Sequence, residues 1–172
     1  MGSLNAFYVR AANAQQIDSI KKAYPNAFTE ADSEFVAVEE DIDADMSMAV
    51  ELGRLSDELR TEVMWMQFQS VTDSFMYLHW NHGRQIRVLI FGFFERERQW
   101  ERVEGSALPW EAAVIFGDLE GAIRFIEDGA ERQKIRTVFE RQLIEIGSEY
   151  PQLDGRETAR GVADFYGLPR WD

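Results

Sequence analysis

Four consecutive short strands constrain the fold of this chain more than any other feature of its sequence. Strands are expected over residues 62–69, 74–80, 85–91 and 98–103, because these segments are rich in β-branched and aromatic residues and the last three are separated by short polar turns. In the first two segments both faces are apolar, since Met64 alternates with Trp65 and Met76 with Tyr77. A sheet that is apolar on both faces has to be covered on both. We therefore expect an antiparallel meander with helices on one face, and helices, a long connection or a partner subunit on the other.

The segments before and after the meander predict helices and two further strands. Residues 5–10 and 34–39 have strand composition, and each is followed by a helical pattern, the first capped by Asn13 and the second over residues 46–60. This gives a βαβα start. The part of the chain that follows the meander predicts helices that begin after Asp118, over residues 131–150 and after Asp154. The final helix is expected to dock with Leu168 and Trp171 as its anchors. The fold class predicted is α+β, with the C-terminal helices covering the sheet.

Length and composition predict one globular domain over residues 1–172. The chain is 45% hydrophobic and 13% aromatic, which is typical of a packed core and not of a disordered chain. Cysteine is absent, which excludes disulfides, thiolate metal sites and cysteine nucleophiles. The longest apolar run, residues 88–94, is far shorter than the roughly 20 residues of a spanning helix. We expect a cytoplasmic protein that does not bind membranes.

An acidic segment provides the first candidate site. The chain has 31 Asp and Glu against 18 Lys and Arg, a net charge of −13, which disfavours nucleic acid as a partner. Nine of the acids lie between Ala23 and Gly53, where there is no Lys or Arg. The residues expected to bind a partner are Glu30, Asp32, Glu39, Glu40, Asp41, Asp43 and Asp45. The leading hypothesis is a non-enzymatic binding or regulatory protein, of the immunity type, that engages a basic protein partner through this acidic face.

No motif in the sequence predicts a catalytic or metal centre. There is no Gly-x-Ser-x-Gly, Walker loop, dinucleotide fingerprint or His-Glu-x-x-His. The two histidines, His79 and His82, are too few for a zinc site in a chain without cysteine. Asp41, Asp43 and Asp45 have the spacing of the first EF-hand ligands, but the glycine and glutamate that complete such a loop are missing. We expect no catalytic residues, no metal and no cofactor.

Two alternatives use the second apolar face of the sheet. One is a small-ligand-binding protein or enzyme with a pocket near Trp65, Tyr77 and His79, since convergent aromatic and titratable side chains are typical of ligand pockets. The other is a homodimer that buries the same face and has a structural role.

Part of the meander resembles bacterial families that are known only as uncharacterised domains. The resemblance rests on Trp80-x-x-Gly83-Arg84-x-x-Arg87-x-Leu89, on Trp100-Glu-Arg-Val-Glu-Gly105 and on Pro109-Trp-Glu111, about a third of the chain. It implies an antiparallel hairpin that continues into a capping connection, and it implies no activity.

Overall fold

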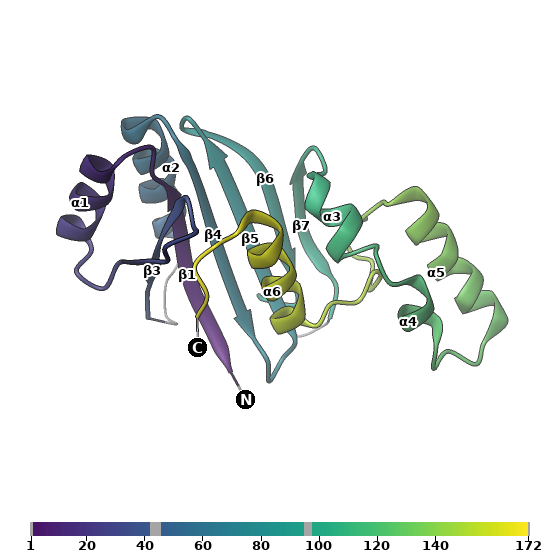
Figure 1. Cartoon of the computed structure of the whole chain (residues 1–172). Coiled ribbons are helices and arrows are strands. Elements are labelled where there is room, and N and C mark those ends of the chain that lie inside the picture. The colour runs from purple at the N-terminus through teal and green to yellow at the C-terminus, as the bar shows by residue number, and fades with distance from the viewer. Residues whose placement is uncertain (1, 42–45, 95–97, 172) are drawn as a thin grey trace.

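The structure, a computed structural model, describes residues 2–41, 46–94 and 98–171 and has an α+β fold around a seven-stranded antiparallel sheet (Figure 1). The order of the strands across the sheet is β2-β3-β1-β4-β5-β6-β7. Their bounds are Ser3–Arg10 (β1), Phe28–Thr29 (β2), Phe35–Glu39 (β3), Glu62–Gln69 (β4), Ser74–Asn81 (β5), Arg84–Phe91 (β6) and Trp100–Gly105 (β7). The predicted βαβα start and four-stranded meander are both confirmed. Strand β1 joins them, because it pairs antiparallel with β3 on one side and β4 on the other.

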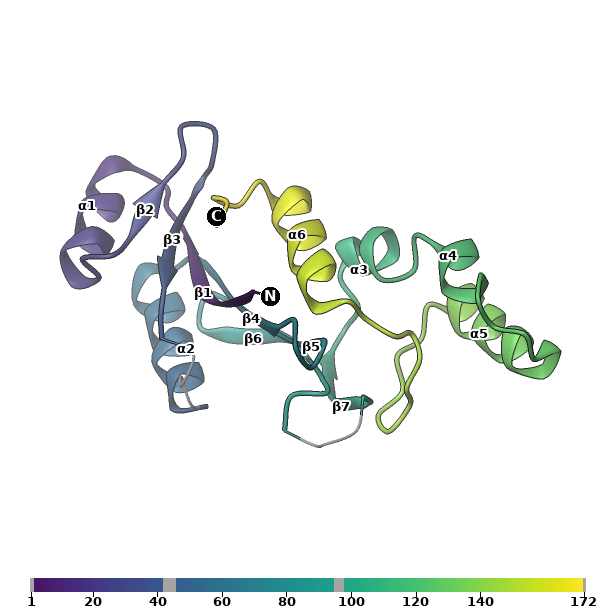
Figure 2. The same ribbon diagram turned by 90° about the horizontal axis from the view of Figure 1, so that it is seen from below.

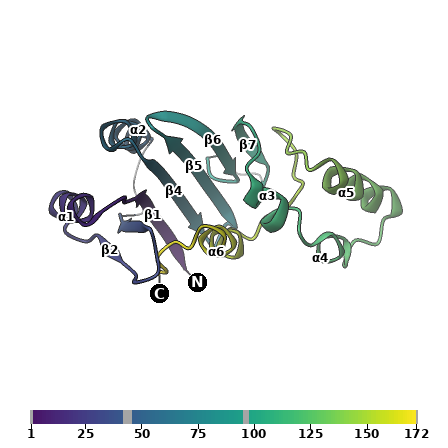
Figure 3. The same cartoon turned by 45° about the horizontal axis from the view of Figure 1, so that its top comes forward.

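Six helices occur in the described part of the chain, and four of them cover the sheet. The bounds are Ala14–Ala23 (α1), Ser47–Leu59 (α2), Pro109–Val114 (α3), Leu119–Ile123 (α4), Gly129–Arg141 (α5) and Gly155–Tyr166 (α6). Figure 2 shows α2 on one side of the strands and α6 on the other, and α1 packs on the same face as α2. Helix α3 lies beside α6, while α4 and α5 pack together beyond β7 (Figure 3). Both sheet faces are therefore covered by helices of the same chain.

The alternation of side chains along the strands divides the core into two layers. The layer under α1 and α2 includes Trp65 and Leu78, and the layer under α3 and α6 includes Met66 and Tyr77. All four side chains are fully buried. The two-sided apolar pattern of the sequence thus corresponds to two separate helix-covered cores.

Helix boundaries agree with the sequence at three N-caps and disagree at one C-terminus. The side chains of Asn13, Asp118 and Asp154 each accept a hydrogen bond from a backbone N–H in the first turn of their helix, as predicted. The helix expected over residues 131–150 instead ends at Arg141. Tertiary pairing explains the early end.

The segment after α5 pairs with β7. The Trp100 amide donates to the carbonyl of Ser148 (2.9 Å), and the Gly147 amide donates to the carbonyl of Trp100 (2.8 Å). These bonds hold a turn, in which the Ser148 amide donates to the carbonyl of Glu145 (3.0 Å), where the apolar periodicity favours a helix. Leu143 and Ile146 are left exposed. In the described ranges, no helix combines the length and the apolar character that crossing a bilayer requires.

Candidate functional site

The candidate site is formed around the C-terminal tail that follows α6. Helix α6 ends at Gly167, whose φ of 64° lies in the left-handed region that favours glycine, and the tail then turns back over the sheet. Ser33 Oγ donates a hydrogen bond to the carbonyl of Gly167 (2.6 Å). The amide of Arg170 donates to Glu30 Oε1 (3.0 Å). Residues more than 130 positions apart in the sequence therefore fix the path of the tail.

Trp171 lies at the centre of the site. Leu168 is buried in the core layer under α6, and the Trp171 ring packs on Phe68 of β4 with 6.3 Å between the ring centroids. This confirms that Leu168 and Trp171 anchor the end of the chain. The Trp171 side chain remains partly exposed, and it forms a wall of two cavities that carry opposite charge.

The first cavity is acidic. Its volume is about 350 Å³, and its lining includes Leu4, Asn5, Glu39, Glu40, Asp41 and Trp171. Asn5 fixes this wall, because its Nδ2 donates to the carbonyl of Asp41 (2.5 Å) and its Oδ1 accepts from Trp65 Nε1 (2.8 Å). Burial, and secondarily the charge of Glu39, raise the pKa of Tyr8. Three carboxylates and the indole of Trp171 line this one cavity.

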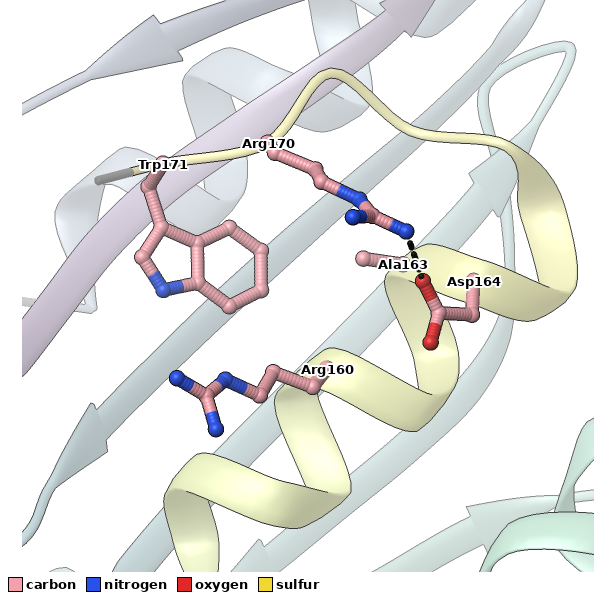
Figure 4. Close-up of a pocket in the computed structure, with 5 residues that line it drawn as sticks. All are labelled: Arg160, Ala163, Asp164, Arg170 and Trp171. Carbon is pink, nitrogen blue, oxygen red and sulfur yellow. Dashed lines mark hydrogen bonds and ion pairs between the residues drawn. The ribbon is translucent and has the colours of Figure 1, made fainter.

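The second cavity has two guanidinium groups. Its volume is about 310 Å³, and it is lined by Arg160, Ala163, Asp164, Arg170 and Trp171 (Figure 4). Arg170 Nη2 pairs with Asp164 Oδ1 at 3.0 Å, and Arg160 pairs with a carboxylate of the preceding turn of α6 at 2.7 Å. Figure 4 shows the Arg160 guanidinium and the Trp171 indole facing the same space. The net charge of the lining is positive, in a chain whose total charge is −13.

The structure divides the acidic segment into two clusters instead of one face. Glu30 and Asp32 lie in the β2–β3 connection, before β3, and Glu30 is engaged with the tail. Glu39, Glu40 and Asp41 lie at the other end of β3, roughly 17 Å away for a five-residue strand. Strand β3 separates the clusters because its own residues are apolar and buried.

The remaining two acids of the predicted partner-binding set, Asp43 and Asp45, lie outside the described residues. The acidic cavity is therefore built from the second half of the segment, and the first half holds the tail in place.

The three residues predicted to line a pocket on the second sheet face do not all lie on the same face. Trp65 lies in the core layer under α1 and α2, while Tyr77 belongs to the layer under α3 and α6, where His79 is bonded to it. The reason is the pairing of the strands: Trp65 is opposite Leu78, so it shares a face with Leu78 and not with its neighbour Tyr77. Helices of the same chain cover both faces of the sheet, and the homodimer stays a prediction.

Tyr77 and His79 instead belong to a row of polar side chains that continues to Glu62 and Arg10. The Tyr77 hydroxyl lies 2.9 Å from His79 Nδ1, and His79 Nε2 lies 3.6 Å from Glu62 Oε1. Glu62 also pairs with Arg10 Nη1 at 2.7 Å. Burial raises the pKa of Tyr77, so its hydroxyl stays protonated. The nearby His79, and after it Arg10, lower the pKa of Glu62.

A buried ion pair lies next to this row under α3. Arg87 Nε and Nη2 donate to the two carboxylate oxygens of Glu111 at 2.8 and 2.6 Å. Arg87 Nη1 donates to the carbonyl of Gly105 (2.8 Å), and Glu111 Oε1 accepts from the amide of Leu108 (2.7 Å). Both charged side chains are at least 96% buried, so this pair fixes α3 on the sheet rather than meeting a ligand.

Sequence reasoning identified Glu39, Glu40 and Asp41 but missed Arg160 and Arg170. The sequence feature that could have pointed to this cavity is Trp171, a large aromatic residue near the end of an acidic chain. In the described ranges, no three His, Asp or Glu side chains gather closely enough to hold a metal ion.

Comparisons of the chain with protein-family models, with curated proteins and with solved structures found no match. The resemblance drawn from Trp80, Gly83 and Arg84 stays a prediction. The site is therefore interpreted from its own geometry.

Proposed function

We propose that this protein binds a partner protein by taking a lysine or arginine side chain of the partner into the acidic cavity. The observation that supports this most directly is that the Trp171 indole lines one cavity together with Glu39, Glu40 and Asp41. Carboxylates attract a cation, and the face of an indole adds to that attraction. A volume of about 350 Å³ accommodates one long side chain and part of its backbone.

The position of the cavity suits recognition. Glu39 is the last residue of β3, and the Glu40 amide donates to the carbonyl of Asn5 in β1 (2.9 Å). The aromatic wall is held by the packing of Trp171 on Phe68, so both walls are tied to strands of the sheet. A site held in this way loses little conformational entropy when a partner binds.

A regulatory role fits these groups better than an enzymatic one. Carboxylates, guanidinium groups and an indole bind charged groups by pairing and stacking. The His79 imidazole, which has the chemistry of a general base, is 2% exposed and lies between Tyr77 and Glu62. We therefore assign the tail site to partner binding of the regulatory or immunity type.

NMR titration of the indole N–H signals tests this proposal. The chain has five tryptophans, of which four, Trp65, Trp80, Trp100 and Trp110, are at most 3% exposed and serve as internal references. The probes are short acetylated and amidated glycine-serine peptides that contain one arginine or, as the control, one citrulline, which is its uncharged isostere. We expect the arginine peptide alone to shift the Trp171 signal, and we expect the shift to weaken as NaCl is raised from about 20 mM to about 200 mM.

Charge-removing variants connect the shift to the acidic wall. The triple variant Glu39→Gln, Glu40→Gln, Asp41→Asn is expected to lose most of the response of Trp171. The matched control removes three exposed carboxylates from the far end of the molecule, Glu120→Gln, Glu127→Gln and Glu140→Gln, and is expected to respond like the unmodified protein. Equal responses to arginine and citrulline, or an undiminished response in the triple variant, would overturn the proposal.

A further inference from the structure

The two cavities of the tail site share Trp171 as a common wall, and their charges are opposite. The Trp171 indole lines one cavity with Glu39, Glu40 and Asp41, and it lines the other with Arg160 and Arg170. A partner segment that contains only basic residues would meet favourable charge in the first cavity and unfavourable charge in the second.

We propose that the second cavity takes a carboxylate side chain of the same partner segment, so that the protein recognises a basic residue and an acidic residue together. This inference rests on the proposed function and names the sequence of the partner that the site would select. The ligand class is an extended peptide with arginine or lysine at one position and aspartate or glutamate two positions away.

The guanidinium groups have donors to spare for such a carboxylate. Each guanidinium has five N–H donors. In the described contacts, the side chain of Arg170 pairs with Asp164 and that of Arg160 pairs with Glu157, and the two arginine side chains are 76% and 49% exposed. Planar guanidinium groups bind carboxylates in bidentate geometry. The N–H groups that are not used in these two pairs can therefore donate to a second carboxylate.

The spacing of two residues follows from the shared wall. In an extended chain, side chains at positions i and i+2 point to the same side and lie about 7 Å apart. Two such side chains can therefore straddle Trp171, one entering each cavity, while the intervening side chain points to solvent. Neighbouring positions would point to opposite sides of the segment and could not do so.

Asp164 lowers the affinity of the second cavity for an anion, and this makes the proposal testable by a gain of binding. Its carboxylate lines the cavity and engages Arg170 at 3.0 Å. Removing this charge with Asp164→Asn frees Arg170 and ends the repulsion of an incoming carboxylate. A variant that merely unfolds the site cannot bind its ligand more tightly.

The experiment compares matched amidated peptides that differ at one position. The first has arginine and glutamate two residues apart, the second has glutamine in place of the glutamate, and the third has the same two charged residues as neighbours. Followed by the Trp171 indole signal, the first peptide should bind about fivefold more tightly than the second or third, the gain expected of one exposed ion pair. Asp164→Asn should increase this preference, and Arg160→Gln together with Arg170→Gln should abolish it, because the glutamate then has no guanidinium group to pair with. The same double variant should bind the glutamine peptide at least as tightly as the unmodified protein does, since it removes positive charge beside the acidic cavity.

The control variant Arg124→Gln removes an exposed guanidinium from the helical region beyond β7 and should leave the preference unchanged. A glutamate peptide without arginine separates this inference from the proposed function. If it shifts the side-chain N–H signals of Arg160 and Arg170, the carboxylate site stands even if arginine binding fails. Equal affinities for the first two peptides overturn the inference even if arginine binding holds.

Replacing the glutamate with phosphoserine tests the other source of an anion. Phosphate and carboxylate both pair with guanidinium groups. A phosphoserine peptide that binds about tenfold or more tightly than the glutamate peptide would overturn the assignment to a carboxylate, whereas equal or weaker binding supports it.

Discussion

Arginine meets carboxylate in two regions of this molecule whose surroundings are opposite. Under α3, Arg87 and Glu111 are joined at 2.6 Å, and their side chains are 4% and 2% exposed. Beside Trp171, Arg170 and Asp164 are joined at 3.0 Å, and their side chains are 76% and 65% exposed. The residue types and the contact are similar, but only the pair beside Trp171 is exposed to solvent.

Burial decides what each pair can do. The buried pair has lost its hydration, so Arg87 depends on Glu111 and on the carbonyl of Gly105 for the interactions that water no longer supplies. The exposed pair keeps its hydration and exchanges one partner for another at little cost. The first pair therefore holds the fold together, and the second is available to a ligand.

The largest expected effect is the loss of the buried guanidinium. Arg87→Gln removes the bidentate bond and leaves the Glu111 carboxylate buried without its counter-charge. We expect the free energy of unfolding, measured by urea titration, to fall by about 3–5 kcal/mol. A loss below about 1 kcal/mol would contradict the contrast between the two regions, because the buried pair would then behave like an exposed one.

A smaller effect is expected from the hydroxyl that supports His79. Tyr77→Phe removes the hydroxyl that is hydrogen-bonded to His79 Nδ1 and leaves that nitrogen buried without this partner. We expect a loss of about 1–3 kcal/mol in the free energy of unfolding. Tyr24→Phe is the matched control, because the Tyr24 hydroxyl has no hydrogen bond in the described contacts and its ring packs on Phe7 in both proteins. Equal losses in the two variants would show that the hydroxyl of Tyr77 contributes nothing specific.

Glu62 lies between the two extremes, since its side chain is 23% exposed. The nearby His79 and the pairing with Arg10 lower its pKa from the ordinary value of 4.5, so its charged form stabilises the fold above that pH. Glu62→Gln is expected to cost about 1–2 kcal/mol at pH 7. The stabilisation is lost as the pH falls below 4.5 and through the lowered pKa, so the two proteins should become equally stable in acid.

Urea titrations between neutral pH and about pH 3 measure this convergence. Glu58→Gln is the control, because Glu58 is exposed and pairs with Arg54 on the surface of α2. A difference between the unmodified protein and Glu62→Gln that stays constant over the whole range would contradict the assigned role of the carboxylate.

The sequence predicts the parts of the fold that depend on local pattern. Alternation of Met64 with Trp65 and of Met76 with Tyr77 is a property of each strand by itself, so it predicts a sheet covered on both faces. The N-caps at Asn13, Asp118 and Asp154 are equally local, because each side chain accepts a hydrogen bond from an amide three positions further along. Features of this kind can be predicted from one sequence.

Features that depend on pairing between distant segments could not be predicted in this way. The helical pattern after Arg141 is overridden because Gly147 and Ser148 bond to the backbone of Trp100. In the tail site, Glu30 bonds to Arg170. Trp171 lines one cavity with Asp41 and another with Arg160. None of these contacts leaves a pattern in the local sequence. The acidic segment was visible in the sequence, but its division by β3 and its indole partner were not.

The smallest expected effect completes the comparison between the two regions. Arg170→Gln is the same substitution as Arg87→Gln, but it removes an exposed ion pair and leaves Asp164 in contact with water. The backbone bond from Arg170 to Glu30 does not involve the side chain, so the tail keeps its anchor. We expect the free energy of unfolding to change by at most about 1 kcal/mol in urea titrations.

A loss close to that of Arg87→Gln would mean that Arg170 is part of the fold. The cavity beside Trp171 would then be a structural contact instead of a binding site. If the variant is stable but no longer prefers the peptide with paired charges, the role of Arg170 is in recognition. An arginine–carboxylate pair then stabilises the fold at buried Arg87 and binds a ligand at exposed Arg170.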